Sequence, residues 1–134
     1  MDFVTQNRVR MYDTDAAGIL YFAQQFRFMQ DAWEQLMDIM GFSLQYLIDE
    51  SHWTMVMVHC EADYKMRLGV HDALTVHSNT GHIGETSFSI AHRIYRKEEL
   101  IGTGKTVQVV LSKGTMSKIP VPDDFRTALE RYLV

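Results

Sequence analysis

Residues 12–40 read YDTDAAGILYFAQQFRFMQDAWEQLMDIM and join an acidic loop to a long apolar helix. The loop carries two carboxylates, Asp13 and Asp15, and we expect the helix to begin near Tyr21 or Phe22. Backbone N–H groups at a helix start lack helical partners and, with the helix dipole, favour negative charge. Such groups can hold a carbonyl oxygen while charge builds on it, with an acidic side chain beside the carbon. This layout is typical of acyl transfer or hydrolysis, although an aspartate before a helix is by itself more often a cap.

An apolar stripe at steps of three and four residues predicts the helix over residues 21–40. The stripe consists of Phe22, Phe26, Met29, Trp33, Leu36, Met37 and Met40. Gly41 is suited to the C′ position that ends the helix, because glycine adopts the left-handed conformation without strain. Ser43 is expected to cap a short second helix over residues 44–50.

Alternating apolar and polar residues predict that most of the remaining chain is β-structure. The predicted strands span residues 3–11, 53–64, 73–80, 85–96 and 100–112, and a short helix is expected over residues 123–133. The apolar members of the first strand are Val4, Val9 and Met11. In the second strand, alternation places Val56, Val58, Cys60, Ala62 and Tyr64 on one face and Met55, Met57, His59, Glu61 and Asp63 on the other. One helix and one antiparallel sheet that bury each other predict an α+β fold in a single domain, residues 1–134.

Glycines in the last long strand add a further expectation. Gly102 and Gly104 lie on the face opposite to Ile101 and Val107, where they would let another backbone approach closely.

The composition is that of a soluble globular domain and argues against several classes of function. Hydrophobic residues make up 46% of the 134 residues and charged residues 22%, which supports a packed core. The formal net charge of -4 argues against broad contact with nucleic-acid phosphates. The chain has no apolar signal segment and no membrane-spanning run, and its single cysteine, Cys60, cannot form an internal disulfide. We therefore expect a cytoplasmic protein without membrane insertion.

One block of the sequence is far more specific than D-T-D alone. It reads Tyr12-Asp-Thr-Asp15, then Gly18-Ile-Leu-Tyr21, and it precedes a long helix and four strands. With these elements the chain resembles, over nearly its whole length, the hot-dog-fold acyl-CoA thioesterases of the 4-hydroxybenzoyl-CoA thioesterase family. Within that family it resembles most the 1,4-dihydroxy-2-naphthoyl-CoA thioesterases. The residues that carry this finer likeness are Tyr21-Phe22, Asp31-Ala32, Val58-His59, Asp63-Tyr64 and the Pro120-x-Pro122 tail.

The resemblance implies that Asp15 is catalytic and that backbone N–H groups around Tyr21 and Phe22 hold the thioester carbonyl. It also places Gly18 and His59 among the substrate-binding residues, with a hydrogen-bonded interface histidine as the alternative for His59. Family members join their sheets into dimers, often paired into tetramers, with active sites at the dimer interface. A homo-oligomer is therefore implied, and no metal or cofactor is implied.

The chain departs from the family pattern at four positions. Many relatives have histidine in place of Phe22 and glutamate in place of Gln30, which bears on the acyl group that is accepted. Relatives often have proline near Arg67 and glycine near His71, which bears on the entrance formed after Tyr64.

The sequence therefore predicts a thioester hydrolase that converts an aromatic acyl-CoA to the free acid and CoA. Asp15 either attacks the carbonyl carbon, giving a mixed anhydride, or activates water as a general base. Asp13 is interpreted as a loop organiser or cap. A non-catalytic acyl-binding module and a thioesterase that acts on acyl carrier protein are the alternatives.

Other groups of residues give weaker signals. His59, Glu61 and Asp63 share a predicted strand face, but no spacing signature supports a metal site there. Cys60 is interpreted as inert core because it lies among valine and alanine. No G-x-S-x-G nucleophile elbow and no G-x-G-x-x-G phosphate loop occurs. The cations available to CoA phosphates include Lys65, Arg67, Arg93, Arg96, Lys113 and Lys118.

Overall fold

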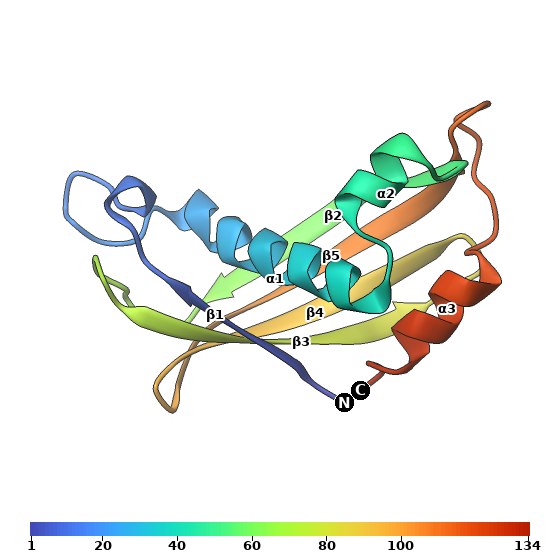
Figure 1. Cartoon of the computed structure of the whole chain (residues 1–134). Coiled ribbons are helices and arrows are strands. Elements are labelled where there is room, and N and C mark those ends of the chain that lie inside the picture. The colour runs from blue at the N-terminus through green and yellow to red at the C-terminus, as the bar shows by residue number, and fades with distance from the viewer.

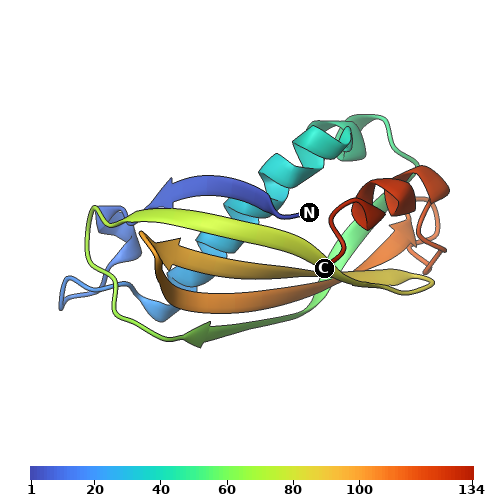
Figure 2. The same ribbon diagram turned by 90° about the horizontal axis from the view of Figure 1, so that it is seen from below.

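A long helix, α1 (Gln25–Met40), lies across one face of an antiparallel sheet in the computed structural model, which describes residues 1–134 (Figure 1). The sheet has five strands in the spatial order β1-β3-β4-β5-β2. These strands are β1 (Phe3–Arg8), β2 (Trp53–Tyr64), β3 (Ala73–Ile83), β4 (Ser87–Arg96) and β5 (Glu99–Ser112). The predicted α+β architecture is confirmed, and β1 and β2 form the two edges of the sheet (Figure 2).

Shorter helical segments complete the fold. They are the 3₁₀ turns η1 (Met11–Asp13) and η2 (Phe22–Gln24) and the helices α2 (Leu44–Asp49) and α3 (Asp123–Glu130). Ser43 caps α2 as predicted, because its Oγ accepts a hydrogen bond from the Tyr46 N–H at 3.1 Å. Gly41 ends α1 in the left-handed conformation, with a φ of 87°. None of the helices combines the length and the apolar character that a membrane crossing requires.

The core forms where α1 lies on the sheet. Trp33 is 3% exposed, and its ring centroid lies 5.6 Å from that of Phe88 on β4. At the end of the sheet near the chain termini, α3 packs against the strands (Figure 1). The Phe125 ring of α3 lies 5.0 Å from Phe42 and 4.9 Å from Trp53, so one aromatic cluster joins α3, β2 and the end of α1.

The buried face of α1 is broader than the predicted stripe and begins later in the chain. The stripe residues that are buried as predicted are Met29, Trp33, Leu36 and Met37. Phe22, however, is 61% exposed, so its inclusion in the stripe was wrong. The chain enters the helix through η2, whose 3₁₀ geometry has three residues per turn and puts Phe22 out of phase with α1. Gln25, Phe28 and Ala32 are buried beside the stripe.

The apolar residues of the predicted first strand, residues 3–11, are not all buried, and the observed strand is shorter. Thr5 and Val9 are buried, whereas Val4 is 49% exposed and Met11 is 78% exposed. Successive side chains of a strand alternate between faces, so Val4 cannot share a face with Val9. The strand also ends at Arg8, and Met11 belongs to η1, where strand alternation does not apply.

Strand β2 contains a β-bulge that changes which residues face α1. Met57 pairs with Gln108 and His59 with Val107, so Val58 is an extra residue with no partner in β5. The alternation read straight through this strand was therefore wrong. Met57 precedes the bulge and Cys60 follows it, yet both side chains line one cavity under α1.

The two glycines of β5 allow the close approach that was predicted, with one difference. A Cβ at Gly102 would lie 2.7 Å from Gln25 Oε1, and a Cβ at Gly104 would overlap the end of Met29. The side chains of α1 therefore fill this space rather than another backbone. Gln25 Nε2 also donates to the carbonyl oxygens of Asp63 and Thr103, at 3.1 Å each, and so fastens the start of α1 to β2 and β5.

Candidate active site

The Asp15 loop, residues 14–21, is a tight turn closed by its own backbone. Thr14 and Leu20 form an antiparallel bridge, and the Asp15 N–H donates to Ile19 O at 2.9 Å. Gly18 N–H donates back to Asp15 O at 3.0 Å, with a φ of 76° that favours glycine. No atom lies within 4 Å of a Cβ built at Gly18, so this glycine is needed for backbone conformation and not for space.

The loop is docked onto the segment that follows β2. Leu20 N–H donates to Leu68 O at 2.9 Å, and Ile19 forms a bridge with Gly69. From the end of β2, the Tyr64 hydroxyl donates to Phe22 O at 2.6 Å. The position of the loop is thus fixed by bonds to residues more than forty positions away in the sequence.

The helix start leaves two backbone donors free. Tyr21 N–H is occupied, because it donates to Asp13 O at 2.8 Å, and Gln24 N–H donates to Tyr21 O at 2.9 Å. No side chain caps this turn, and the N–H groups of Phe22 and Ala23 have no acceptor within the chain. Of the two residues predicted to hold a carbonyl oxygen, Phe22 therefore has an available N–H and Tyr21 does not.

Asp13 is buried and fully engaged. Arg27 Nε donates to its Oδ1 at 2.8 Å and Arg27 Nη2 to its Oδ2 at 2.5 Å, while the Arg10 N–H donates to Oδ2 at 2.7 Å. Burial alone would raise the pKa of this carboxyl, but the hydrogen bonds from Arg27 and Arg10 and the Arg27 charge outweigh it and lower the pKa below its usual value. Asp13 thus ties the loop to α1 and β1, as expected of a loop organiser.

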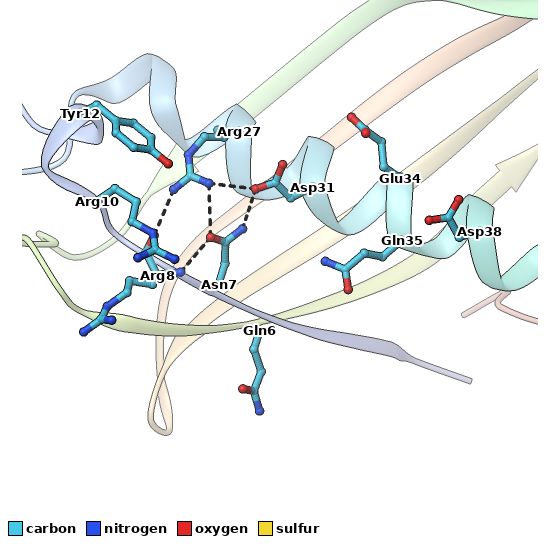
Figure 3. Close-up of a pocket in the computed structure, with 10 residues that line it drawn as sticks. All are labelled: Gln6, Asn7, Arg8, Arg10, Tyr12, Arg27, Asp31, Glu34, Gln35 and Asp38. Carbon is cyan, nitrogen blue, oxygen red and sulfur yellow. Dashed lines mark hydrogen bonds and ion pairs between the residues drawn. The ribbon is translucent and has the colours of Figure 1, made fainter. Parts of the chain in front are cut away.

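Arg27 connects Asp13 to a polar groove between β1 and α1, of about 600 Å³ (Figure 3). Its Nη1 donates to Asp31 Oδ2 at 2.9 Å, and Asn7 Nδ2 donates to the same oxygen at 2.9 Å. The side chains that line this groove bond to one another across it, as the dashed lines in Figure 3 show. Through Arg27, the residues of this groove therefore hold the Asp13 side chain in place. The groove lies on the β1 side of α1, away from β2.

Asp15 contrasts with Asp13. Its side chain is exposed, and its one hydrogen bond is accepted by Oδ1 from the Ala17 N–H at 2.8 Å. Oδ2 has no partner in the chain and remains free to act on a neighbouring group.

A largely apolar space, which we call the helix–sheet cavity, lies between α1 and the β2 side of the sheet. Its first part has a volume of about 170 Å³ and is lined by Phe26, Met29, Gln30, Trp33, Met57, Cys60, His92 and Thr106. An adjoining part of about 250 Å³ shares Gln30, Trp33 and Met57 and extends to Gln108. Cys60 is exposed and lines this cavity, so its interpretation as inert core was wrong. The β-bulge and the free edge of β2 account for the difference.

A second cavity, which we call the entrance pocket, lies beside the Asp15 loop and is lined in part by Phe22. It has a volume of about 330 Å³ and is lined by Ile19, Leu20, Phe22, Tyr64, Lys65, Met66, Arg67 and Leu68. Of the cations available to a phosphate, the structure brings Lys65 and Arg67 next to the Asp15 loop.

His59 lies apart from both cavities. It pairs with Val107 after the bulge, on the sheet face opposite to Cys60, and is more than half exposed. Its Nε2 lies 3.1 Å from Glu61 Oε1. No group of three or more His, Cys, Asp or Glu side chains in the chain is arranged to hold a metal ion.

His92 is a cavity residue that the sequence reasoning missed. It lies on β4 and is 1% exposed, its Nδ1 lies 2.8 Å from Ser78 Oγ, and its Nε2 has no partner. Burial lowers the pKa of His92 to about 4. The signal was present in the alternation, because His92 occupies the same strand face as Phe88, Ile90 and Ile94.

An exposed carboxylate, free helix-start donors and an apolar cavity beneath the helix, on a sheet-and-helix fold, are the features of a thioester hydrolase site of the hot-dog class. The chain matches the Thioesterase-like superfamily over residues 9–129 and belongs to this family. It is 29% identical over 133 residues to the 1,4-dihydroxy-2-naphthoyl-CoA hydrolase of Synechococcus sp. (strain WH7803), covering 94% of this chain and 84% of that protein.

Two further similarities agree with this assignment. The 1,4-dihydroxy-2-naphthoyl-CoA hydrolase of Prochlorococcus marinus (strain NATL2A) is 31% identical over 117 residues, covering 82% of this chain and 76% of that protein. The crystal structure of a 1,4-dihydroxy-2-naphthoyl-CoA thioesterase from Synechocystis superposes with a TM-score of 0.89 at 25% identity, covering 96% of each chain. The predicted hot-dog fold and thioester hydrolase class are thus confirmed.

Proposed function

We propose that the chain hydrolyses an aromatic acyl-CoA thioester to the free acid and CoA, with Asp15 as the catalytic residue. The observation that carries this proposal is the pair of free N–H groups at Phe22 and Ala23, a few residues after an exposed carboxylate. Donors that are already in place for a developing oxyanion provide one of the largest contributions to acyl-transfer catalysis. Gly18 shapes the turn that brings Asp15 before them.

Two routes use the same residues. In the first, the Asp15 carboxylate attacks the carbonyl carbon, the C–S bond breaks, and CoA leaves as a thiolate that takes up a proton. Water then attacks the mixed anhydride, which releases the acid and restores the carboxylate. In the second route, Asp15 takes a proton from a water molecule as that water attacks the carbonyl. The tetrahedral intermediate then breaks its C–S bond, and the CoA thiolate leaves and takes up the proton from Asp15. In both, the Phe22 N–H donates to the carbonyl oxygen.

The helix–sheet cavity and the entrance pocket support a division of the substrate between them. The helix–sheet cavity is lined mainly by apolar and aromatic side chains and suits an acyl group, whereas Lys65 and Arg67 in the entrance pocket suit the CoA phosphates. The aromatic acyl group is supported by the names of the relatives, which are 1,4-dihydroxy-2-naphthoyl-CoA hydrolases.

The proposed assembly is a homodimer, with dimers paired into a tetramer, in the cytoplasm. The free edge of β2 supports the dimer. This strand has 12 residues and no neighbour on its outer side, and Val56, Met57 and Val58 on it are 38%, 43% and 57% exposed. A long apolar edge strand pairs readily with another strand. Joining two β2 strands would place His59 at the dimer interface, which favours a hydrogen-bonded interface histidine over contact with an acyl group in the helix–sheet cavity, because His59 lies on the opposite face of the sheet. A monomeric mass by light scattering at micromolar concentration would contradict this assembly.

Thiol release from a panel of aromatic and straight-chain acyl-CoA thioesters tests the proposal. We expect turnover that is highest for aromatic acyl groups. The same acyl group presented on acyl carrier protein should be hydrolysed more slowly. Tight binding of the thioesters without thiol release would contradict the proposal and identify an acyl-binding module.

A further inference from the structure

The wall of the helix–sheet cavity contains two buried polar atoms without partners, His92 Nε2 in its first part and Gln108 Nε2 in its far part, and the first part is lined by the earlier residues of α1. His92 is 1% exposed, its Nε2 makes no hydrogen bond, and the residue lines the cavity together with Phe26 and Met29. Buried polar atoms in folded proteins nearly always have a hydrogen-bond partner, because leaving one unpaired costs free energy. An unpaired atom that lines a cavity is therefore suited to receive its partner from a ligand.

The imidazole ring is held in a single orientation. Ser78 Oγ is fully buried on the neighbouring strand β3 and lies 2.8 Å from His92 Nδ1. Burial lowers the pKa of His92 to about 4, so the ring is neutral at neutral pH. With Nδ1 bonded to Ser78, Nε2 offers one hydrogen-bonding position, as acceptor or as donor according to the tautomer.

His92 lies within reach of an acyl group whose carbonyl is held at the helix start. It pairs with Gly104 across the sheet, and the missing side chain of Gly104 is replaced by Met29 of α1. Met29 stands seven residues beyond Phe22, which is roughly 10 Å along a helix axis. This separation suits the length of an aromatic acyl group with a substituent on its far side.

We infer that His92 is a specificity-determining residue whose Nε2 recognises a hydroxyl substituent on the aromatic acyl group, with Ser78 as the positioning residue. This inference rests on the proposed function and adds to it the residue that would recognise a ring hydroxyl, a substituent that the acyl groups in the names of the relatives already carry. The cavity offers a plain hydrocarbon ring only apolar contacts at this point. A hydroxyl group gains a hydrogen bond there, and its absence leaves Nε2 unpaired.

The test compares benzoyl-CoA with its three ring-hydroxylated isomers, in the parent protein and in His92→Phe. The parent should hydrolyse the best hydroxylated isomer with a kcat/KM about tenfold above that of benzoyl-CoA, the value of one neutral hydrogen bond. In His92→Phe this ratio should fall close to one. His92→Gln, whose amide reaches a similar position, should restore part of the preference.

Gln108 supplies a matched control. Its Nε2 is also buried and unpaired, but it lies four residues from Gly104 along β5 and lines the far part of the cavity. Because Gln108 lines the same cavity, Gln108→Met can change kcat and KM for every thioester, but it should retain the preference for the hydroxylated isomer. A ratio that responds to Gln108→Met and not to His92→Phe would overturn the assignment to His92.

The outcomes separate the two proposals. Turnover of aromatic thioesters with no preference for any hydroxylated isomer, or with a preference that His92→Phe retains, overturns the inference and leaves the proposed function intact. Absence of turnover for every thioester overturns both. Should His92→Phe fail to fold, the ¹⁵N shift of His92 Nε2 in the parent decides the question. This chemical shift should change when a non-hydrolysable hydroxyphenacyl-CoA thioether is added and should not change when phenacyl-CoA is added. Equal changes with both ligands would overturn the inference.

Discussion

Asp13 and Asp15 lie two residues apart in the sequence but differ in burial and in hydrogen bonding. Asp13 is 0% exposed, and its oxygens accept hydrogen bonds from Arg27 and from the Arg10 N–H. Asp15 is exposed and accepts one hydrogen bond, from the Ala17 N–H. Asp13 is bonded on both oxygens and holds the chain together, whereas Asp15 keeps an oxygen available.

The comparison distinguishes a carboxylate that holds the chain together from one that keeps an oxygen free, although both precede a helix. Asp13 uses its charge to orient Arg27 and its backbone oxygen to occupy the Tyr21 N–H. By occupying that donor, Asp13 leaves Phe22 as the first residue with a free N–H. The buried aspartate thus prepares the place at which the exposed one is proposed to act.

The largest expected effect comes from Asp15→Asn. A nucleophile or general base must be an ionised carboxylate, so kcat should fall by a factor on the order of 10² to 10⁴. Asparagine retains a side-chain oxygen for the Ala17 N–H, so folding and assembly should be unchanged. Thiol-release kinetics, circular dichroism and light scattering measure the three quantities. Asp13→Asn should lower kcat much less. Parental turnover in Asp15→Asn would remove the proposed catalytic role and leave this loop as a helix cap.

The second prediction extends the comparison to a buried group without a charged partner. Burial lowers the pKa of His92 from 6.5 to about 4. As the pH falls through 6.5, the unfolded chain binds a proton that the folded protein does not bind until about pH 4. The free energy of unfolding should therefore fall by about 3 kcal/mol across this window. Urea unfolding of the parent and of His92→Phe at several pH values isolates this contribution, because the other histidines are common to both. If the free energies of unfolding of the parent and of His92→Phe change in parallel with pH, this prediction is wrong.

The third prediction concerns stability at Asp13. Asp13→Asn removes the charge that opposes Arg27 within a mostly buried network and should lower the free energy of unfolding by about 2 kcal/mol at neutral pH. Because the pKa of Asp13 is lowered in the folded state, its stabilisation is present above the ordinary value of 3.8 and is lost as the pH falls below it. The difference between parent and variant should therefore shrink in acid. Asp15→Asn is the matched control and should leave the free energy of unfolding at neutral pH close to that of the parent.

Local patterns predicted much of this fold, and tertiary contacts account for what they missed. The periodicity of α1 and the bounds of β2, residues 53–64, are properties of consecutive side chains and were read correctly. The bulge at Val58 depends on how β2 pairs with β5, and alternation cannot reveal it. Tyr21 and Phe22 differ in whether their backbone N–H is free, and this difference depends on one hydrogen bond from Tyr21 to Asp13. The exposure of Cys60 depends on the position of β2 at the sheet edge. The D-T-D block marked the site, but its chemistry depends on these contacts.

The smallest expected effect lies in the entrance pocket, beside the same loop. Lys65 and Arg67 line it with Phe22, so the double variant Lys65→Gln/Arg67→Gln should raise KM for CoA thioesters roughly threefold to tenfold, the usual value of exposed charge pairs. The effect should weaken in 0.5 M salt, because exposed charges are screened. The control is Lys113→Gln, whose Nζ donates to Ile48 O at 2.9 Å and lines none of these cavities. Since Asp15 and the Phe22 N–H remain in place, kcat should change less than KM. A KM that rises equally in the control, or equally in high salt, would exclude these two cations from CoA binding and leave the role of Asp15 unaffected.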